Sequence, residues 1–150
     1  MHAVEAARKS PVTIAPDRTI TEAADLMDRS AVGALVVTEP DGRPVGIVTD
    51  RDLVVRAVAR RASADARIDS VMSTDLVTLS PDADLRDALE VFEEQPIRRL
   101  PLVDGEHLAG MLTMDDLVVD LTADLTRLTR PVTAQVLFGH REPVTPATIT

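Results

Sequence analysis

The segment Gly46-Ile47-Val48-Thr49-Asp50-Arg51-Asp52 is the most informative part of this sequence, because it occurs twice. It returns as Gly110-Met111-Leu112-Thr113-Met114-Asp115-Asp116. In both copies an apolar run typical of a strand meets a Thr-x-x-Asp group, which is a variant of the capping box that begins a helix. We therefore expect the chain to pass from a strand into a helix at two equivalent places.

The repeat extends well beyond these two segments. Upstream, matching residues recur at a constant spacing: Val12, Thr13, Pro16, Asp17, Ala23 and Leu35 return as Val77, Thr78, Pro81, Asp82, Ala88 and Leu100. After a one-residue deletion, Asp52-Leu53-Val54-Val55 returns as Asp116-Leu117-Val118-Val119. One structural unit is therefore present twice in the chain.

Each unit has the order strand, helix, strand, strand, helix. The expected strands cover 12–14, 34–38 and 45–49, then 77–79, 100–103 and 108–113; the first helices start at Thr19 and Asp84, and the closing helices cover 50–60 and 114–125. Asp-Gly pairs at 41–42 and 104–105 are typical of hairpin turns. One unit is too small to be stable alone. We predict an α+β fold in which two β-α-β-β-α repeats pack sheet to sheet with pseudo-two-fold symmetry.

The predicted boundaries follow from the repeat. They are 8–60 for the first repeat, 61–69 for a polar, alanine-rich linker, 70–128 for the second repeat and 129–150 for a tail. Within the tail we interpret Val132–Phe138 as a candidate extra strand and the last ten residues as mobile.

Composition disfavours several classes of function. The net charge of −9 opposes binding to nucleic acid or an anionic membrane, and the two aromatic residues, Phe92 and Phe138, cannot form a base-stacking surface. The chain has no cysteine, and its three histidines are scattered, so we expect no metal site. No apolar run is long enough to span a bilayer, and no signal peptide is visible, so we expect a cytoplasmic protein.

The Thr-x-x-Asp groups allow two interpretations. In one, Thr49 with Asp52 and Thr113 with Asp116 only cap their helices. In the other, the helix N-terminus attracts phosphate and the aspartate accepts hydrogen bonds from the cis-diol of a ribose. Capping geometry alone leaves both open.

The duplicated unit resembles a tandem pair of CBS domains, also called a Bateman module. The resemblance covers roughly residues 8–128 and rests on Thr-x-x-Asp after the third strand and on Ile97-Arg98-Arg99-Leu100-Pro101-Leu102-Val103 before the second hairpin. It implies a regulatory module that catalyses no reaction and requires no cofactor. It also implies an adenosine-containing ligand such as AMP, ADP, ATP or S-adenosylmethionine, bound in clefts between the repeats.

The resemblance also implies the residues of two clefts. One cleft would use Thr113 and Asp116 for ribose, Met111 as an apolar contact, Ser10, Val12, Val32, Gly33 and Ala34 near adenine, and Arg98 and Arg99 for phosphate. Its counterpart would use Thr49, Asp52, Ile47, Asp75, Val77 and Ile97. Because Gly33-Ala34 stands where the second copy has Arg98-Arg99, we expect the Thr113/Asp116 cleft to bind phosphorylated ligands more tightly. Alternatively, the two arginines pair with surface acids or with a partner subunit.

Four functions remain to be compared. The leading hypothesis is a homodimeric sensor of an adenosine compound, with the regulated partner protein unknown. Dimerisation follows from the resemblance, and the spacing of Leu117, Leu121, Leu125 and Leu128 indicates core or subunit interface. The alternative is a ligand-free structural interaction module. An enzyme is disfavoured because no acid–base pair is apparent, and a nucleic-acid binder is disfavoured by charge.

Overall fold

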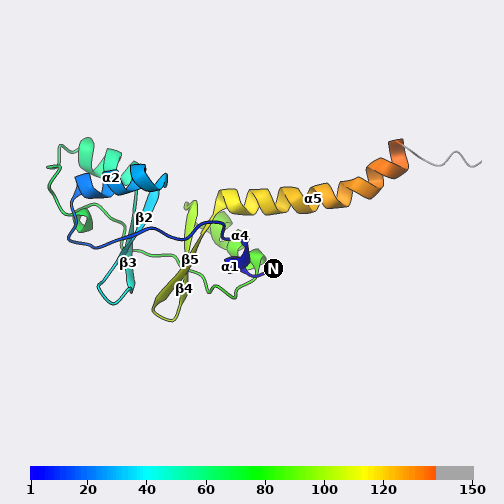
Figure 1. Cartoon of the computed structure of the whole chain (residues 1–150), viewed down its shortest axis with the longest axis horizontal. Coiled ribbons are helices and arrows are strands. Elements are labelled where there is room, and N and C mark those ends of the chain that lie inside the picture. The colour runs from blue at the N-terminus through cyan, green and yellow to red at the C-terminus, as the bar shows by residue number, and fades with distance from the viewer. Residues whose placement is uncertain (138–150) are drawn as a thin grey trace, which may run out of the picture. The chain divides into compact units, whose positions relative to one another are not determined.

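The computed structural model describes residues 1–137, which fall into two units, Met1–Leu117 and the part of Val118–Thr150 that precedes residue 138 (Figure 1). Both sheets lie in the first unit, one in each repeat. Each repeat contains both helices and strands, so the α+β class is confirmed. Within residues 1–137, no helix has the length and hydropathy that crossing a membrane requires.

The first repeat packs a three-stranded sheet against helices. β1 (Thr13–Ile14) pairs in parallel with β2 (Ala34–Thr38), and β2 pairs antiparallel with β3 (Pro44–Thr49). The helix α2 (Ile20–Ser30) begins at the predicted capping box, in which Glu22 N donates to Thr19 Oγ1 at 3.1 Å and Thr19 N donates to Glu22 Oε2 at 2.8 Å. The cap fixes where α2 starts and hence which face it turns to the sheet.

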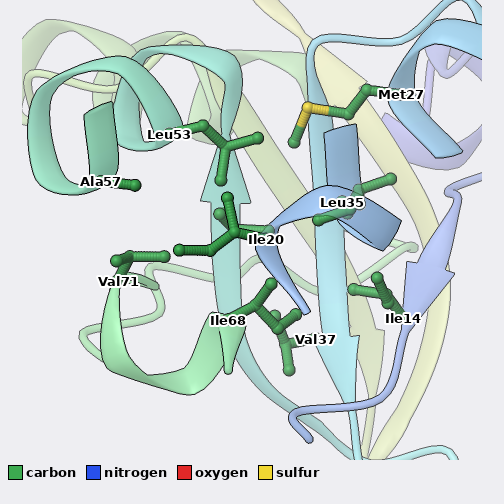
Figure 2. Close-up of a cluster of buried hydrophobic side chains, with 11 residues drawn as sticks. Ile14, Ile20, Met27, Leu35, Val37, Leu53, Ala57, Ile68 and Val71 are labelled. Atoms are coloured by element: carbon green, nitrogen blue, oxygen red, sulfur yellow. The ribbon is translucent and has the colours of Figure 1, made fainter. Parts of the chain in front are cut away.

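The core of the first repeat is a single aliphatic cluster (Figure 2). Alternate residues of β2, Leu35 and Val37, point into it because successive side chains of a strand face opposite ways. Ile68, in the short helix η2 (Ile68–Ser70), is fully buried there, so the end of the predicted linker is part of the core. The full cluster comprises Ile14, Ile20, Ala23, Met27, Leu35, Val37, Val48, Leu53, Ala57, Ile68 and Val71.

The second repeat has a two-stranded sheet. β4 (Arg99–Asp104) pairs antiparallel with β5 (His107–Thr113), and α4 (Leu85–Glu94) begins at the predicted cap residue Asp84. The expected strand 77–79 is wrong as a full strand: only Leu79 pairs, forming a parallel bridge with Leu102. Short segments at a sheet edge are the least determined by local pattern, because their pairing depends on the neighbouring strand.

A short helix that the repeat did not predict, α1 (Ala3–Ala6), completes the second core. Ala3 and Ala6 are 0% and 1% exposed and pack with Ala88, Phe92 and Leu100. Backbone bonds hold the segment, including Ala3 N to Ala83 O at 2.8 Å. The beginning of the chain therefore contributes to the repeat that is more distant in sequence.

The two sheets face each other through the sides that do not meet their own helices. Val36 in β2 and Pro101 in β4 are buried, yet neither belongs to the core cluster of its own repeat. Each sheet also gains one bridge from the segment that leads into the other repeat: Lys9 pairs with Met111, and Ser73 pairs with Ile47. These equivalent exchanges confirm the predicted sheet-to-sheet packing with pseudo-two-fold symmetry.

The closing helices differ from their expected lengths. In the first repeat α3 (Asp50–Asp52) continues into a π-helical segment, η1 (Leu53–Val58). In the second, α5 (Met114–Leu137) is much longer than 114–125, and it contains the predicted repeat boundary at residue 128.

The candidate strand Val132–Phe138 is wrong for residues 132–137, which are helical, while Phe138 and the last ten residues lie outside the described part. The β-branched residues Val132 and Thr133 favour strands only weakly. Apolar residues at helical spacing outweigh them in α5: Val118, Leu121, Leu125, Leu128, Val132 and Val136.

Candidate functional site: two pockets at the strand–helix junctions

The first Thr-x-x-Asp group joins β3 to α3. Asp52 N donates to Thr49 Oγ1 at 3.1 Å, and Thr49 N donates to Asp52 Oδ2 at 2.9 Å. The other carboxylate oxygen, Asp52 Oδ1, lies 3.6 Å from Arg56 Nε, and the Asp52 side chain is 16% exposed. The group is therefore a complete capping box, as the capping interpretation requires.

The second group joins β5 to α5 in the same manner. Asp116 N donates to Thr113 Oγ1 at 3.1 Å, and Thr113 N donates to Asp116 Oδ2 at 3.0 Å. The Thr113 hydroxyl also lies within hydrogen-bond distance of Asp116 Oδ2, at 2.8 Å. Both contacts with the carboxylate use Oδ2, so Asp116 Oδ1 keeps its capacity to accept a hydrogen bond.

A pocket of about 540 Å³ opens beside Thr49 and Asp52. We call it the Thr49 pocket. It brings together all six residues that the resemblance implied for this cleft: Ile47, Thr49, Asp52, Asp75, Val77 and Ile97. Its walls come from both repeats, since Ile47 and Thr49 belong to β3 whereas Pro101 belongs to β4. Its volume lies in the range of small-molecule sites.

A second pocket of about 330 Å³ opens beside Thr113 and Asp116. We call it the Thr113 pocket. Nine of the ten residues implied for this cleft line it: Ser10, Val12, Val32, Gly33, Ala34, Arg99, Met111, Thr113 and Asp116. The capping hydrogen bonds therefore leave space beside both junctions, and Asp52 and Asp116 each line a pocket.

Arg98 is the one residue implied for the Thr113 cleft that does not line the Thr113 pocket. It lines the Thr49 pocket and not the Thr113 pocket, and its Nη2 lies 3.5 Å from Asp115 Oδ1. Both side chains of this ion pair are largely exposed, at 71% and 85%, so the pair contributes little to stability. Arg98 immediately precedes β4, which begins at Arg99, and both arginines line the Thr49 pocket.

The Thr49 pocket has more cationic side chains than the Thr113 pocket, although tighter binding of phosphorylated ligands was expected of the Thr113/Asp116 cleft. The Thr49 pocket is lined by Arg51, Arg56, Arg98 and Arg99, together with three aspartates. The Thr113 pocket is lined by Lys9 and Arg99, together with two aspartates. The larger number of guanidinium groups favours phosphate on the Thr49 side.

Several pocket residues had no place in the sequence-based site, among them Arg56, Met72 and Lys9. Arg56 lines the Thr49 pocket and donates through Nη1 to Val71 O at 3.1 Å and to Met72 O at 3.3 Å. Its position four residues after Asp52 on a helix was a usable signal for the ion pair. Met72 and Lys9 are brought in by tertiary pairing of the segments around Ser73 and Lys9, which no local pattern encodes.

Across 1–137, no three His, Cys, Asp or Glu side chains are grouped so that they could hold a metal ion. Carboxylates and guanidinium groups dominate the polar walls of both pockets. Such walls suit hydrogen bonds to hydroxyl and phosphate groups.

Comparison with known proteins agrees with this architecture. The sequence model of the CBS domain matches residues 3–58 and 68–122. The CBS domain-containing protein YhcV of Bacillus subtilis is 41% identical over 108 residues, which are 72% of this chain and 76% of YhcV. Inosine-5'-monophosphate dehydrogenase of Methanocaldococcus jannaschii is 31% identical over 126 residues, but these cover only 24% of that enzyme.

One solved structure is similar over nearly its whole length. It is a CBS domain protein from Pyrobaculum aerophilum complexed with AMP, with a TM-score of 0.75 and 28% identity. The similarity covers 86% of this chain and 99% of that one.

Proposed function

Because this chain belongs to the CBS-domain family and carries the domain twice, we propose that it is a regulatory module that binds an adenosine-containing ligand in its two pockets without catalysing a reaction. The observation that carries the proposal is the coincidence of each Thr-x-x-Asp group with a cavity lined by both repeats. The Pyrobaculum protein, similar in fold and complexed with AMP, supports an adenine nucleotide as the ligand class.

The walls of the Thr49 pocket offer what such a ligand needs. Asp52 can accept hydrogen bonds from ribose hydroxyl groups, since a carboxylate oxygen has two lone pairs and only one is used by the cap. Apolar side chains suitable for a purine face the same cavity: Ile47, Val77, Ile97 and Pro101. Arg51 and Arg98 supply positive charge for phosphate. We therefore propose this pocket as the tighter site for AMP, ADP or ATP.

The Thr113 pocket is smaller and less cationic. Val12, Val32 and Ala34 provide an apolar wall opposite Thr113 and Asp116. We propose that it accepts the same nucleoside, with weaker dependence on phosphate. S-adenosylmethionine, which carries no phosphate, is a suitable member of this ligand class.

The experiment is a thermal-shift and calorimetric titration of the full chain with AMP, ADP, ATP and S-adenosylmethionine, with GMP as a control for the base. A ligand at 100 times its Kd should stabilise the chain by about 2.7 kcal/mol. Asp52→Ala should abolish most of the nucleotide response. Asp87→Ala is the matched control, because Asp87 closes the capping box of α4 and lines neither pocket.

If none of the four adenosine compounds binds, the proposal is wrong, and the ligand-free structural module is the better description. Incubation with ATP followed by measurement of released phosphate tests the absence of catalysis. Phosphate release that depends on Asp52 would make the chain an enzyme.

We also propose that the chain forms a homodimer through α5. Val118, Leu121, Leu125, Leu128 and Val132 alternate at spacings of three and four residues, which is the heptad pattern of a two-stranded coiled coil. All five are between 48% and 71% exposed, whereas Leu117 is 2% exposed and belongs to the second core. Of the predicted leucine row, Leu117 therefore belongs to the core, whereas Leu121, Leu125 and Leu128 belong to an exposed apolar stripe.

Light scattering coupled to size-exclusion chromatography tests this assembly. The wild type should elute as a dimer, and Leu125→Glu should raise the dimer Kd at least tenfold by burying a charge in the seam. Ala123→Glu is the control, since residue 123 lies on the opposite side of the helix from Leu121 and Leu125. A monomeric wild type, or an unaffected Leu125→Glu dimer, would contradict this interface.

A further inference from the structure

Arg99 is the one cationic residue that lines both pockets of the described chain. It is the first residue of β4 and is half-buried. Two other arginines of the Thr49 pocket form ion pairs with carboxylates, Arg56 with Asp52 and Arg98 with Asp115. No ion pair within residues 1–137 holds the Arg99 guanidinium, which is therefore available to an anion in either pocket.

Gly33 makes room for this arginine. A Cβ atom at Gly33 would lie 2.6 Å from Arg99 Nη2 and 3.0 Å from Asp50 Oδ2. Gly33 lines the Thr113 pocket, and Asp50 lines the Thr49 pocket. The Arg99 guanidinium thus lies against the backbone at the point where the two pockets approach each other.

Alignment of the two repeats explains why only one of the two junctions has an arginine at this position. Because Leu35 corresponds to Leu100, the residue that corresponds to Arg99 in the first copy is Ala34, and the residue that corresponds to Arg98 is Gly33. Pseudo-two-fold symmetry would otherwise place one arginine at each junction. Among the described residues, Arg99 is instead the one guanidinium that lines both pockets, while Arg51, Arg56 and Arg98 line only the Thr49 pocket.

We infer that the two pockets compete for Arg99, so that a phosphate bound in one pocket weakens the binding of a phosphorylated ligand in the other. This inference rests on the proposed function. A guanidinium can form its strong bidentate contact with only one phosphate at a time, and a second phosphate nearby adds repulsion. An uncharged nucleoside has no phosphate and therefore does not compete for Arg99. The chain therefore favours one phosphorylated and one uncharged adenosine compound over two phosphorylated ones.

Coupling between sites is measured by a thermodynamic cycle and is reciprocal. The probes are AMP and adenosine, which differ only in the phosphate. Asp116→Ala and Asp52→Ala each disable one pocket and give the affinity of the other pocket alone. In the wild type, the product of the two AMP dissociation constants should exceed the product of these single-pocket values by about tenfold or more. For adenosine the two products should agree.

Arg99→Gln should abolish the AMP coupling while leaving adenosine binding unchanged. Arg98→Gln is the matched control, because the neighbouring arginine lines only the Thr49 pocket, and it should preserve the coupling. Gly33→Ala provides an independent test: its Cβ would displace the Arg99 guanidinium from the junction, so AMP coupling should fall there as well.

The outcomes separate this inference from the function on which it rests. Independent binding of AMP to both pockets, or coupling that persists in Arg99→Gln, would overturn the shared-arginine inference alone. Failure of both AMP and adenosine to bind the wild type would overturn the proposed function and the inference together.

Discussion

Arg56 Nε lies 3.6 Å from Asp52 Oδ1, and the same guanidinium donates through Nη1 to Val71 O and Met72 O. One side chain thus links the capped aspartate of the first repeat to the segment that leads into the second. The corresponding position in the second repeat is Asp120, so this link exists only at the Thr49 pocket.

Replacing Arg56 should therefore weaken the fold as well as the pocket. Arg56→Gln removes charge-assisted bonds to two carbonyls from a side chain that is 41% exposed, and we expect a loss of about 1–2 kcal/mol in the free energy of unfolding. Urea denaturation measures the loss. Arg60→Gln, which changes an exposed arginine on the same segment, should leave the midpoint within error of wild type.

All three capping boxes should contribute to stability, but only two of them should also contribute to ligand binding. Asp52→Ala, Asp116→Ala and Asp87→Ala each remove a carboxylate that closes a helix cap, and each should cost about 0.5–2 kcal/mol. Only the first two should also weaken adenosine binding. Equal ligand affinity in all three variants, measured by calorimetry, would assign Asp52 and Asp116 to capping alone.

Gly46 and Gly110 occupy equivalent places in the repeat but differ in the space around them. A Cβ at Gly46 would lie 2.6 Å from Met72 Sδ and 3.0 Å from Ser73 O, whereas at Gly110 the nearest atom is Leu102 Cδ1 at 3.3 Å. Gly46→Ala should destabilise the chain by about 1–3 kcal/mol, because the backbone of Ser73 pairs with Ile47 and cannot easily move. Gly110→Ala should cost less. Thermal unfolding of the two variants in parallel measures both losses. A larger loss in Gly110→Ala than in Gly46→Ala would contradict this account.

The packing of α1 against the second core is tested at Ala3. Ala3 is 0% exposed and Val4 is 38% exposed, although they are adjacent. Ala3→Leu adds three carbon atoms to a filled core, and we expect a loss of about 1–3 kcal/mol. Val4→Leu should be nearly neutral. If both variants melt at the wild-type temperature, the segment does not belong to the folded core.

Two helix caps predict a fall in stability at acid pH. The hydrogen bond from Thr19 N, helped by Arg18, lowers the pKa of Glu22 despite an opposing desolvation effect. The hydrogen bond from Arg86 N lowers the pKa of Asp84 in the same way. A carboxyl whose pKa is lower in the folded state stabilises the fold above its unfolded-state pKa. That stabilisation is lost as the pH falls through the folded-state pKa.

Unfolding curves between pH 7 and about pH 3 measure this effect. Glu22→Gln keeps an acceptor for Thr19 N but does not titrate, so its stability should fall less steeply with acid than that of the wild type. A difference between the two proteins that stays constant over the whole range would show that Glu22 does not contribute through ionisation.

Much of the fold could be predicted because its signals are local. The caps at Thr19 and Asp84, the apolar run of β2 and the Asp-Gly turns each depend on a few adjacent residues. Glycines 42 and 105 have φ values of +84° and +60°, the left-handed conformation that such turns require. Because the unit is duplicated, each local prediction in one repeat could be compared with its counterpart in the other repeat.

The parts that could not be predicted are set by distant contacts. The burial of Ala3 and the pairing of Ser73 with Ile47 join segments whose own patterns carry no mark of their partners. Arg98 lines the Thr49 pocket and not the Thr113 pocket, because a long side chain just before β4 can extend to either side and the local sequence does not specify which. Residues 132–137 were assigned to a strand because β-branched residues obscured a helical spacing.

The sequence by itself determined that one unit occurs twice and that a hydroxyl and a carboxylate stand at each strand–helix junction. Hydrogen bonds that span three residues are enough to specify those junctions. Only the tertiary structure decided that each junction opens on a cavity and that Arg99 serves both, since cavities and shared side chains arise where two sheets meet.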